Sequence, residues 1–163
     1  PAVLRKYRLL FNKKAYRKHL PDSIGYANIN DDPESHVEGV LYDIHPHHLD
    51  LLDRSERYPD HYNRRPVIVE TDDEVQECFA YQAQPHRVAT GLVPLRDYLD
   101  HLLAADCFLS PKYKQALEDT PTYEGKCTCC HSTLELVFLR NQDGFHPLCQ
   151  PCRENRSSGA TSF

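Results

Sequence analysis

The stretch that decides the fold is residues 37–65, which read VEGVLYDIHPHHLDLLDRSERYPDHYNRR. Residues 37–44 have apolar side chains on both faces of an extended chain, and this pattern predicts a central, buried β-strand. Residues 46–55 have leucines at helical spacing behind a proline, which is well tolerated at the first helical position. The stretch therefore predicts a strand, a short helix and, at the helix exit, the acidic residue Glu56.

The rest of the chain supplies weaker elements around this centre. Residues 12–36 contain many glycine, proline, asparagine and aspartate residues and predict a loop. Within it, residues 25–29 form a small apolar island that is either a short strand or an ordered loop on the core. Residues 66–70 and 77–83 predict the two strands of an antiparallel hairpin, because a short polar turn separates them. A further strand is expected at residues 7–11, and helices are expected at residues 94–105 and 112–118.

The composition of the 163 residues fits one domain of ordinary size with a small appendage. No run of about 18 apolar residues exists, so no membrane contact is expected, and the absence of a visible signal peptide predicts a cytoplasmic protein. Residues 1–20 hold seven of the 19 basic side chains and no acid, whereas the whole chain has a net charge of −5. This basic segment suits either nucleic acid or a solvated strand edge. The acidic remainder favours the strand edge, so nucleic acid is not an expected partner.

The C-terminal part carries two cysteine pairs, Cys127-x-x-Cys130 and Cys149-x-x-Cys152, which are separated by 18 residues. Two such pairs suit one tetrahedral Zn²⁺ ion. Residues 134–148 contain two short apolar segments around a polar turn and predict the β-hairpin of a zinc ribbon. Two disulfides are the alternative, but the missing secretory signal favours a structural zinc. Three spare donors can replace a cysteine in the ligand set: Cys129, His131 and His146.

The composition changes after about residue 119, which divides the chain into parts. Residues 1–119 form the main predicted domain, and residues 120–155 form a zinc-ribbon-like module. Residues 156–163 predict a disordered tail. Four thiolates leave no open position on a zinc ion, so the module is expected to stabilise the C-terminus or to bind a protein partner.

Glu56 is the candidate catalytic acid. It ends its predicted helix, where the partial negative charge of the helix dipole opposes ionisation, and Asp53 lies one turn before it. Both effects predict a raised pKa, toward values that are useful for proton transfer near neutral pH. An exposed helix-end acid paired with Arg57 is the alternative, and the residues alone favour it.

Several polar side chains surround this candidate in the sequence. Tyr58, Tyr62 and Arg64 follow Glu56 closely and are candidates to close a site or to hold an anionic group of a substrate. The three histidines of residues 45–48 invite a metal interpretation. No carboxylate or thiol accompanies them in the pattern of a mononuclear site, so we interpret them as solvated residues at the start of a helix.

Seven short segments carry a family resemblance: GYANI (25–29), VEGVLY (37–42), LDRSE (52–56), HYNRR (61–65), PVIVE (66–70), CFAYQA (78–83) and PLRDYL (94–99). In their order and spacing they resemble the gamma-glutamylcyclotransferase family. The resemblance covers about residues 1–118 of the chain. No single segment is diagnostic, and the specificity comes from all of them together.

The resemblance implies an α+β fold, a small mixed β-barrel flanked by helices, which is followed here by the zinc-ribbon hairpin. It implies release of 5-oxoproline from a small-molecule γ-glutamyl amide, with no cofactor for catalysis. The catalytic glutamate of the family falls on Glu56, three residues after Asp53, and acts as general acid and base. Tyr62, Arg64 and Tyr58 are then expected to bind the substrate.

The sequence departs from the family pattern at its beginning. The family starts with a strand and a Tyr-Gly-Ser-Asn loop, whose backbone N–H groups hold the glutamyl part of the substrate, and this sequence contains no such loop. We expect the loop to precede Pro1 in a longer product. The alternatives are a non-catalytic binding module of the same fold and a zinc-ribbon interaction protein.

Overall fold

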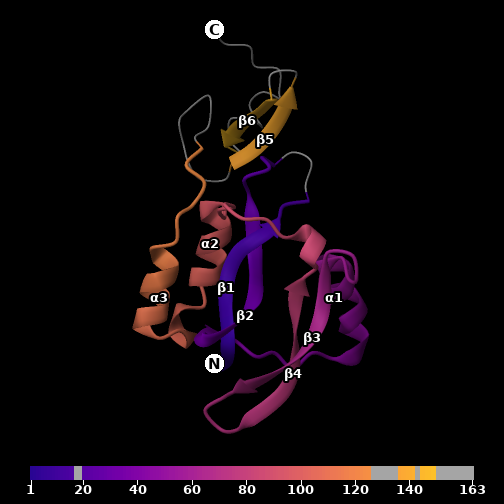
Figure 1. Ribbon diagram of the computed structural model, residues 1–163, viewed down its shortest axis with the longest axis vertical. Coiled ribbons are helices and arrows are strands. Elements are labelled where there is room, and N and C mark those ends of the chain that lie inside the picture. The colour runs from indigo at the N-terminus through magenta and orange to yellow at the C-terminus, as the bar shows by residue number, and fades with distance from the viewer. Residues whose placement is uncertain (17–19, 126–135, 142–143, 150–163) are drawn as a thin grey trace.

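The computed structural model describes residues 1–16, 20–125, 136–141 and 144–149. It has an α+β fold in which short helices flank an antiparallel sheet (Figure 1). The strands of the sheet are β1 (Ala2–Lys14), β2 (Gly25–Gly39), β3 (Tyr62–Glu70) and β4 (Val75–Ala83). The helices are α1 (Leu49–Glu56), α2 (Arg96–Leu103) and α3 (Pro111–Glu118), and 3-10 turns occupy Pro46–His48, Pro85–Arg87 and Asp106–Phe108.

The sheet is open, so the predicted mixed β-barrel is wrong. Its strand order is β2-β1-β3-β4, and every neighbouring pair is antiparallel. The two edge strands approach each other through side chains instead of a backbone ladder. Asn28 Oδ1 accepts a hydrogen bond from the Ala83 N–H at 2.7 Å. Gln82 Nε2 donates to the Ile29 carbonyl at 2.9 Å. The sheet therefore curls on itself without closing.

Two sequence predictions about β2 are wrong. Residues 12–36, predicted as a loop, contribute the end of β1 and most of β2, and the strand predicted at residues 37–44 ends at Gly39. β2 lies at the edge of the sheet, where polar side chains reach solvent or distant partners, so asparagine and aspartate do not break it. Asp31, for example, forms an ion pair with Arg65 at 2.8 Å. The residues after Gly39 continue as an irregular segment.

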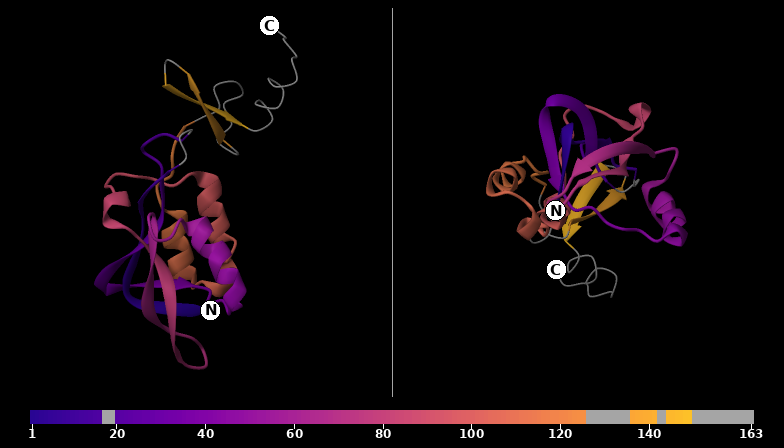
Figure 2. Two further views of the ribbon diagram at one scale, coloured as in Figure 1. Left: turned by 90° about the vertical axis from the view of Figure 1, so that its right-hand side faces the viewer. Right: turned by 90° about the horizontal axis from the view of Figure 1, so that it is seen from below.

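The predicted helices and the predicted hairpin are confirmed. The hairpin of residues 66–83 is formed by β3 and β4. α1 follows a turn in which His45 Nδ1 accepts a hydrogen bond from the His47 N–H (3.4 Å), and α3 is capped by Ser110, which accepts one from the Tyr113 N–H (3.2 Å). Figure 1 and the right-hand view of Figure 2 place α1 on the opposite side of the sheet from α2 and α3. None of the helices in the described part has the length and apolar character that a bilayer crossing requires.

The apolar core lies between the beginning of β1 and the second half of β3. Alternation along β3 separates its side chains into two faces, so Val67 and Val69 are buried while Ile68 between them is 59% exposed. Removal of apolar surface from water, at about 25 cal/mol per Å², drives this packing. The buried members of this cluster come from three strands: Ala2, Leu4, Ile29, Val67 and Val69. A second buried cluster contains Leu20 and Ile24, and Leu99 on α2 and Leu117 on α3 are buried as well.

A separate two-stranded antiparallel hairpin consists of β5 (Leu136–Asn141) and β6 (Gly144–Cys149). It falls where the sequence predicts a hairpin, but nothing in the described residues supports its assignment to a zinc ribbon. Cys149 and His146 lie in β6, and the tail at residues 156–163 is outside the described residues. The other predicted ligands and spare donors are also outside them: Cys127, Cys129, Cys130, His131 and Cys152. The zinc site therefore stays a prediction.

Candidate active site

Glu56 is the last residue of α1, and the chain reverses immediately after it. Arg57 adopts a left-handed conformation (φ 53°) and closes the helix by donating its N–H to the Arg54 carbonyl at 3.3 Å. The Glu56 side chain is half-buried. Burial raises the pKa of Glu56, and the positive charge of Lys13 partly offsets this effect. Glu56 is thus a carboxyl group with an increased affinity for a proton.

The sequence predicted this direction but assigned it another cause, the helix dipole and the charge of Asp53. In the structure the Asp53 carboxylate is already engaged. It accepts a hydrogen bond from the Tyr81 hydroxyl at 2.6 Å and lies 3.4 Å from Arg64 Nε. Because Arg64 balances the charge of Asp53, desolvation of the Glu56 carboxyl is the dominant cause.

The Glu56 carboxyl faces a point where elements from both halves of the sheet meet. Burial is the main cause that raises the pKa values of Tyr62 on β3, Tyr81 on β4 and Tyr98 on α2, and the negative charge of Glu56 adds to each shift. The same charge raises the pKa of Lys13 on β1 against its burial. Four elements outside α1 therefore direct titratable side chains to the neighbourhood of one carboxyl group.

Tyr62, a predicted substrate-binding residue, has a structural partner. It is 9% exposed, and its hydroxyl donates a hydrogen bond to the Ala27 carbonyl at 2.9 Å. The Tyr98 hydroxyl accepts a hydrogen bond from the N–H of the same residue at 3.2 Å. Two tyrosines, from β3 and α2, thus fix the Ala27 peptide groups of β2 next to the candidate site.

Tyr58 and Arg64, the other predicted substrate-binding residues, lie together. The Arg64 guanidinium sits 4.7 Å from the centre of the Tyr58 ring and 5.9 Å from that of Phe79. Tyr58 is 38% exposed, and its peptide bond to Pro59 is cis. This pair therefore forms a stacked arginine–tyrosine surface beside the Asp53 carboxylate, separate from the contacts of the Tyr62 hydroxyl.

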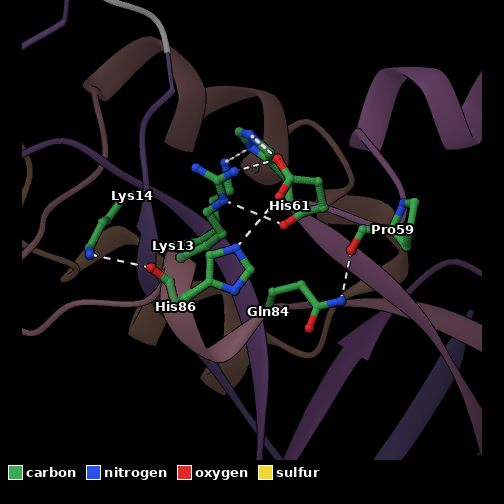
Figure 3. A network of polar contacts seen from close by, with 8 residues as sticks. Lys13, Lys14, Pro59, His61, Gln84 and His86 are labelled. Carbon is green, nitrogen blue, oxygen red and sulfur yellow. Dashed lines mark hydrogen bonds and ion pairs between the residues drawn. The ribbon is translucent and has the colours of Figure 1, made fainter.

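Sequence reasoning missed two buried polar residues, Lys13 and His61. The Lys13 side chain is 1% exposed, and its Nζ lies 3.1 Å from His61 Nδ1 (Figure 3). Burial lowers the pKa of Lys13 to about 8. Apolar alternation does not reveal Lys13, because the register of β1 against β2 shifts between Leu10 and Lys13 and interrupts the period of two.

Asp60 joins this buried pair to the surface. Its carboxylate pairs with Arg87, lies 3.5 Å from His61 Nε2 and lies 3.6 Å from His86 Nε2. Beside it, Gln84 Nε2 donates a hydrogen bond to the Pro59 carbonyl at 2.7 Å (Figure 3). These contacts fix the loop that connects α1 to β3, and with it the position of His61.

Within the described residues, no group of three or more histidine, cysteine, aspartate or glutamate side chains is placed to hold a metal ion. The histidine rings of residues 45–48 contact one another in tilted or edge-on arrangements at centroid distances of 4.0 to 6.2 Å, and the three residues are exposed. A cavity of about 550 Å³ lies between β1, β2 and α3, and Glu56 is not among its lining residues. We place the candidate site by the groups around Glu56 and not by that cavity, whose lining includes Arg8, Glu34, His36 and Tyr113.

Known proteins match the part of the chain that contains the candidate site. The family described as "Gamma-glutamyl cyclotransferase, AIG2-like" matches residues 1–100, which include Lys13, Glu56 and His61. A relative from Halalkalibacterium halodurans, named "Putative gamma-glutamylcyclotransferase BH1612", is 36% identical over 95 residues. This match covers 55% of the present chain and 86% of that protein.

Solved structures share the fold. One named "Gamma-glutamyl cyclotransferase" has a TM-score of 0.65 and 22% identity, and the match covers 77% of this chain and 76% of that one. An uncharacterised protein from Homo sapiens has a TM-score of 0.64 and 22% identity, with 76% and 73% covered. YkqA from Bacillus subtilis has a TM-score of 0.63 and 22% identity, with 75% and 45% covered. At this identity the structures support the fold, while the sequence matches over the Glu56 region identify the family. The chain belongs to the gamma-glutamyl cyclotransferase, AIG2-like family.

Proposed function

We propose that this protein is a gamma-glutamyl cyclotransferase that releases 5-oxoproline from a γ-glutamyl amide. The observation that carries the proposal is Glu56, a half-buried carboxyl group whose pKa is raised by burial, at the point where four other elements direct titratable side chains. Membership of the family supports the reaction class. A buried carboxyl with a raised pKa suits a group that must both accept and return a proton near neutral pH.

The proposed reaction uses one carboxyl group twice. Ionised Glu56 accepts a proton from the α-ammonium of the substrate, and the freed amine attacks the γ-carbonyl carbon of the same molecule. A new C–N bond closes the five-membered ring as the original amide C–N bond breaks. Protonated Glu56 returns its proton to the leaving amine, and the ring nitrogen gives up its second proton, so that the products are 5-oxoproline and the ammonium form of the released amine. Because nucleophile and carbonyl belong to one molecule, ring closure needs little further ordering.

Tyr58, Tyr62 and Arg64 are proposed to contact the substrate, with different contributions. Tyr58 is more exposed than Tyr62, and its ring contacts the Arg64 guanidinium, so this pair suits the carboxylate of a substrate. Tyr62 already donates its hydroxyl to the Ala27 carbonyl and is better placed to support the wall of the site. A structural zinc bound by Cys127, Cys130, Cys149 and Cys152 is a separate proposal with no part in these steps.

The test is release of 5-oxoproline from a panel of γ-glutamyl amides: γ-glutamyl amino acids, γ-glutamylamines and glutathione. Glu56→Gln keeps the size of the side chain and removes its ability to accept a proton. We expect kcat/KM on the best substrate to fall by about a hundredfold to ten-thousandfold.

The matched control is Glu118→Gln. Glu118 is the last residue of α3, as Glu56 is the last residue of α1, and both helices contain eight residues. Glu118 is exposed, so this substitution should leave activity unchanged. An equal loss in the two variants, full activity in Glu56→Gln, or no 5-oxoproline from any substrate of the panel would contradict the proposal.

A further inference from the structure

The surroundings of Lys13 are unusual for a lysine near the end of a strand. Its side chain is 1% exposed, and its Nζ lies 3.1 Å from His61 Nδ1. Three tyrosine rings enclose the ammonium group, with centroids at 5.0 Å (Tyr16), 5.6 Å (Tyr26) and 5.3 Å (Tyr62). Aromatic faces stabilise a cation without returning it to water, so the structure holds this charge in a fixed place.

His61 is oriented to accept a hydrogen bond from this lysine. Its Nε2 faces the Asp60 carboxylate at 3.5 Å, which favours the tautomer with the proton on Nε2 and leaves the lone pair of Nδ1 for Lys13 (Figure 3). Burial lowers the pKa of His61, and the positive charges of Lys13 and Arg87 lower it further. The histidine is therefore kept neutral, and the positive charge stays on the lysine.

Two contacts tie this arrangement to the end of α1, where Glu56 lies. The Tyr16 ring packs against Lys13 on one side and against the Arg57 guanidinium at 4.2 Å. The His61 N–H donates to the Arg57 carbonyl at 2.9 Å. Tyr16 and His61 thereby connect Lys13 to Arg57, the residue that follows Glu56. Lys13 and Glu56 themselves lie 43 positions apart in the sequence.

Among the described residues, Lys13 is the cation whose charge lowers the pKa of Glu56. The charge of Glu56 in turn acts on Tyr62 on β3, Tyr81 on β4 and Tyr98 on α2. Burial and the positive charges of Arg87 and Arg57 lower the pKa of Lys13, and the charge of Glu56 raises it. His61 and the rings of Tyr16, Tyr26 and Tyr62 lie around the Lys13 ammonium.

We propose that Lys13 is a positioning residue of the cyclotransferase site: its enclosed ammonium stabilises the ionised form of Glu56 and so sets the pH above which Glu56 can accept a proton from the substrate. The inference rests on the proposed function for its catalytic meaning. Lys13 itself does not touch the reacting atoms, because its ammonium is covered by His61 and the tyrosine rings. It acts through Glu56 alone.

The pH dependence of kcat/KM tests this role. Lys13→Met removes the charge and keeps an unbranched apolar body, so the proton affinity of Glu56 rises. The acidic limb of the profile, which reports ionisation of Glu56, should then move to higher pH by about one unit. Lys13→Arg restores a positive charge and should move the limb back toward the wild type. Lys14→Met is the matched control, since Lys14 is exposed and its Nζ donates to the His86 carbonyl at 3.5 Å.

A direct titration separates failure of this inference from failure of the proposed function. The carboxyl carbon of Glu56 is followed by NMR in the protein without substrate, and its signal is assigned as the one absent from Glu56→Gln. Lys13→Gln, which keeps a donor for His61 without a charge, is titrated beside Lys13→Met in case one of them is poorly folded. A higher Glu56 pKa in the neutral variants supports the inference even if no γ-glutamyl amide is cleaved. An unchanged titration overturns it, however active the enzyme is.

Discussion

The two ends of the sheet are built from the same strands, but one buries an apolar cluster, whereas the other buries polar side chains beside a second apolar cluster, Leu20 and Ile24. The apolar end is the core cluster of Ala2, Leu4, Ile29, Val67 and Val69. The polar end consists of the buried side chains Lys13, Asn28 and His61 together with half-buried Glu56. β1 runs through both ends, from Leu4 to Lys13.

This difference separates the residues that stabilise the fold from the residues that can take part in catalysis. Burial of apolar groups is favourable at any position where the packing is good. Burial of polar groups costs free energy unless each group finds a partner, and Lys13, His61 and Asn28 each have one. Lys13 contacts His61, and Asn28 bonds to the Ala83 N–H and to Asn12. These hydrogen bonds offset the cost of burying the polar groups, so the protein can fold with ionisable side chains inside it. We expect such side chains to contribute to catalysis more than to the free energy of folding.

The largest expected effect on stability tests the apolar end. Leu4→Ala shortens a side chain that is 7% exposed and leaves a cavity, so the free energy of unfolding in urea should fall by about 3 to 4 kcal/mol. Ile68→Ala, at a β3 position that is 59% exposed, is the control and should lose less than about 1 kcal/mol. Similar losses of unfolding free energy in the two variants would mean that burial of Leu4 in the apolar cluster does not stabilise the protein more than an exposed side chain does.

The second prediction uses pH to measure the cost of the polar end. Burial lowers the pKa of Lys13 from 10.5 to about 8. Between these values the unfolded chain binds more protons than the folded protein, so rising pH stabilises the fold. Relative to Lys13→Met, the wild type should gain at most about 3 kcal/mol over this range, and less if solvent screens the site. Urea unfolding at several pH values measures the gain, and a difference that stays constant with pH would refute a buried charged lysine.

The sequence predicted correctly those elements that are determined by residues close together in the chain. The helix that ends at Glu56 and the hairpin of residues 66–83 follow from spacing, a proline and a polar turn within a few residues of each other. β2 was missed because its partners are distant. Asp31 looks like a loop residue until Arg65, on another strand, is placed beside it. The barrel was implied by the family resemblance, whereas in the structure the sheet stays open and its edges meet through side chains such as Asn28.

In the candidate site, too, the sequence predicted some residues and missed others. Glu56 was found because the family resemblance supplied its position, and its raised pKa was predicted in the correct direction for the wrong reason. Lys13 was included in a basic segment interpreted as a solvated strand edge. Its partner His61 lies 48 residues further along the chain, and no local pattern connects the two. The polar end is therefore the part of the molecule that sequence reasoning resolves least.

The third prediction concerns a buried amide that joins the two edge strands. Asn28→Ala leaves the buried Ala83 N–H without its acceptor and removes the bonds to Asn12 and Asn30, so stability should fall by about 2 kcal/mol. Asn30→Ala is the control, since Asn30 accepts one bond from Asn28 and the Ala83 contact remains. Thermal unfolding measures both variants. If Asn30→Ala is as damaging as Asn28→Ala, the contact between the edge strands does not stabilise the curled sheet.

The smallest effect is expected from the ion pair beside the apolar end, between Arg5 and Glu70. Arg5 Nη2 lies 2.8 Å from the Glu70 carboxylate, and the hydrogen bond from Arg5 holds the pKa of Glu70 below its usual value. The two side chains are 57% and 46% exposed, so water and salt screen the attraction and the ordering of two long side chains opposes it. Arg5→Ala should therefore leave the urea midpoint unchanged within error, at low and at high salt alike. A clear loss at low salt that disappears at high salt would show that surface charge contributes to this end, and that apolar burial alone does not account for its stability.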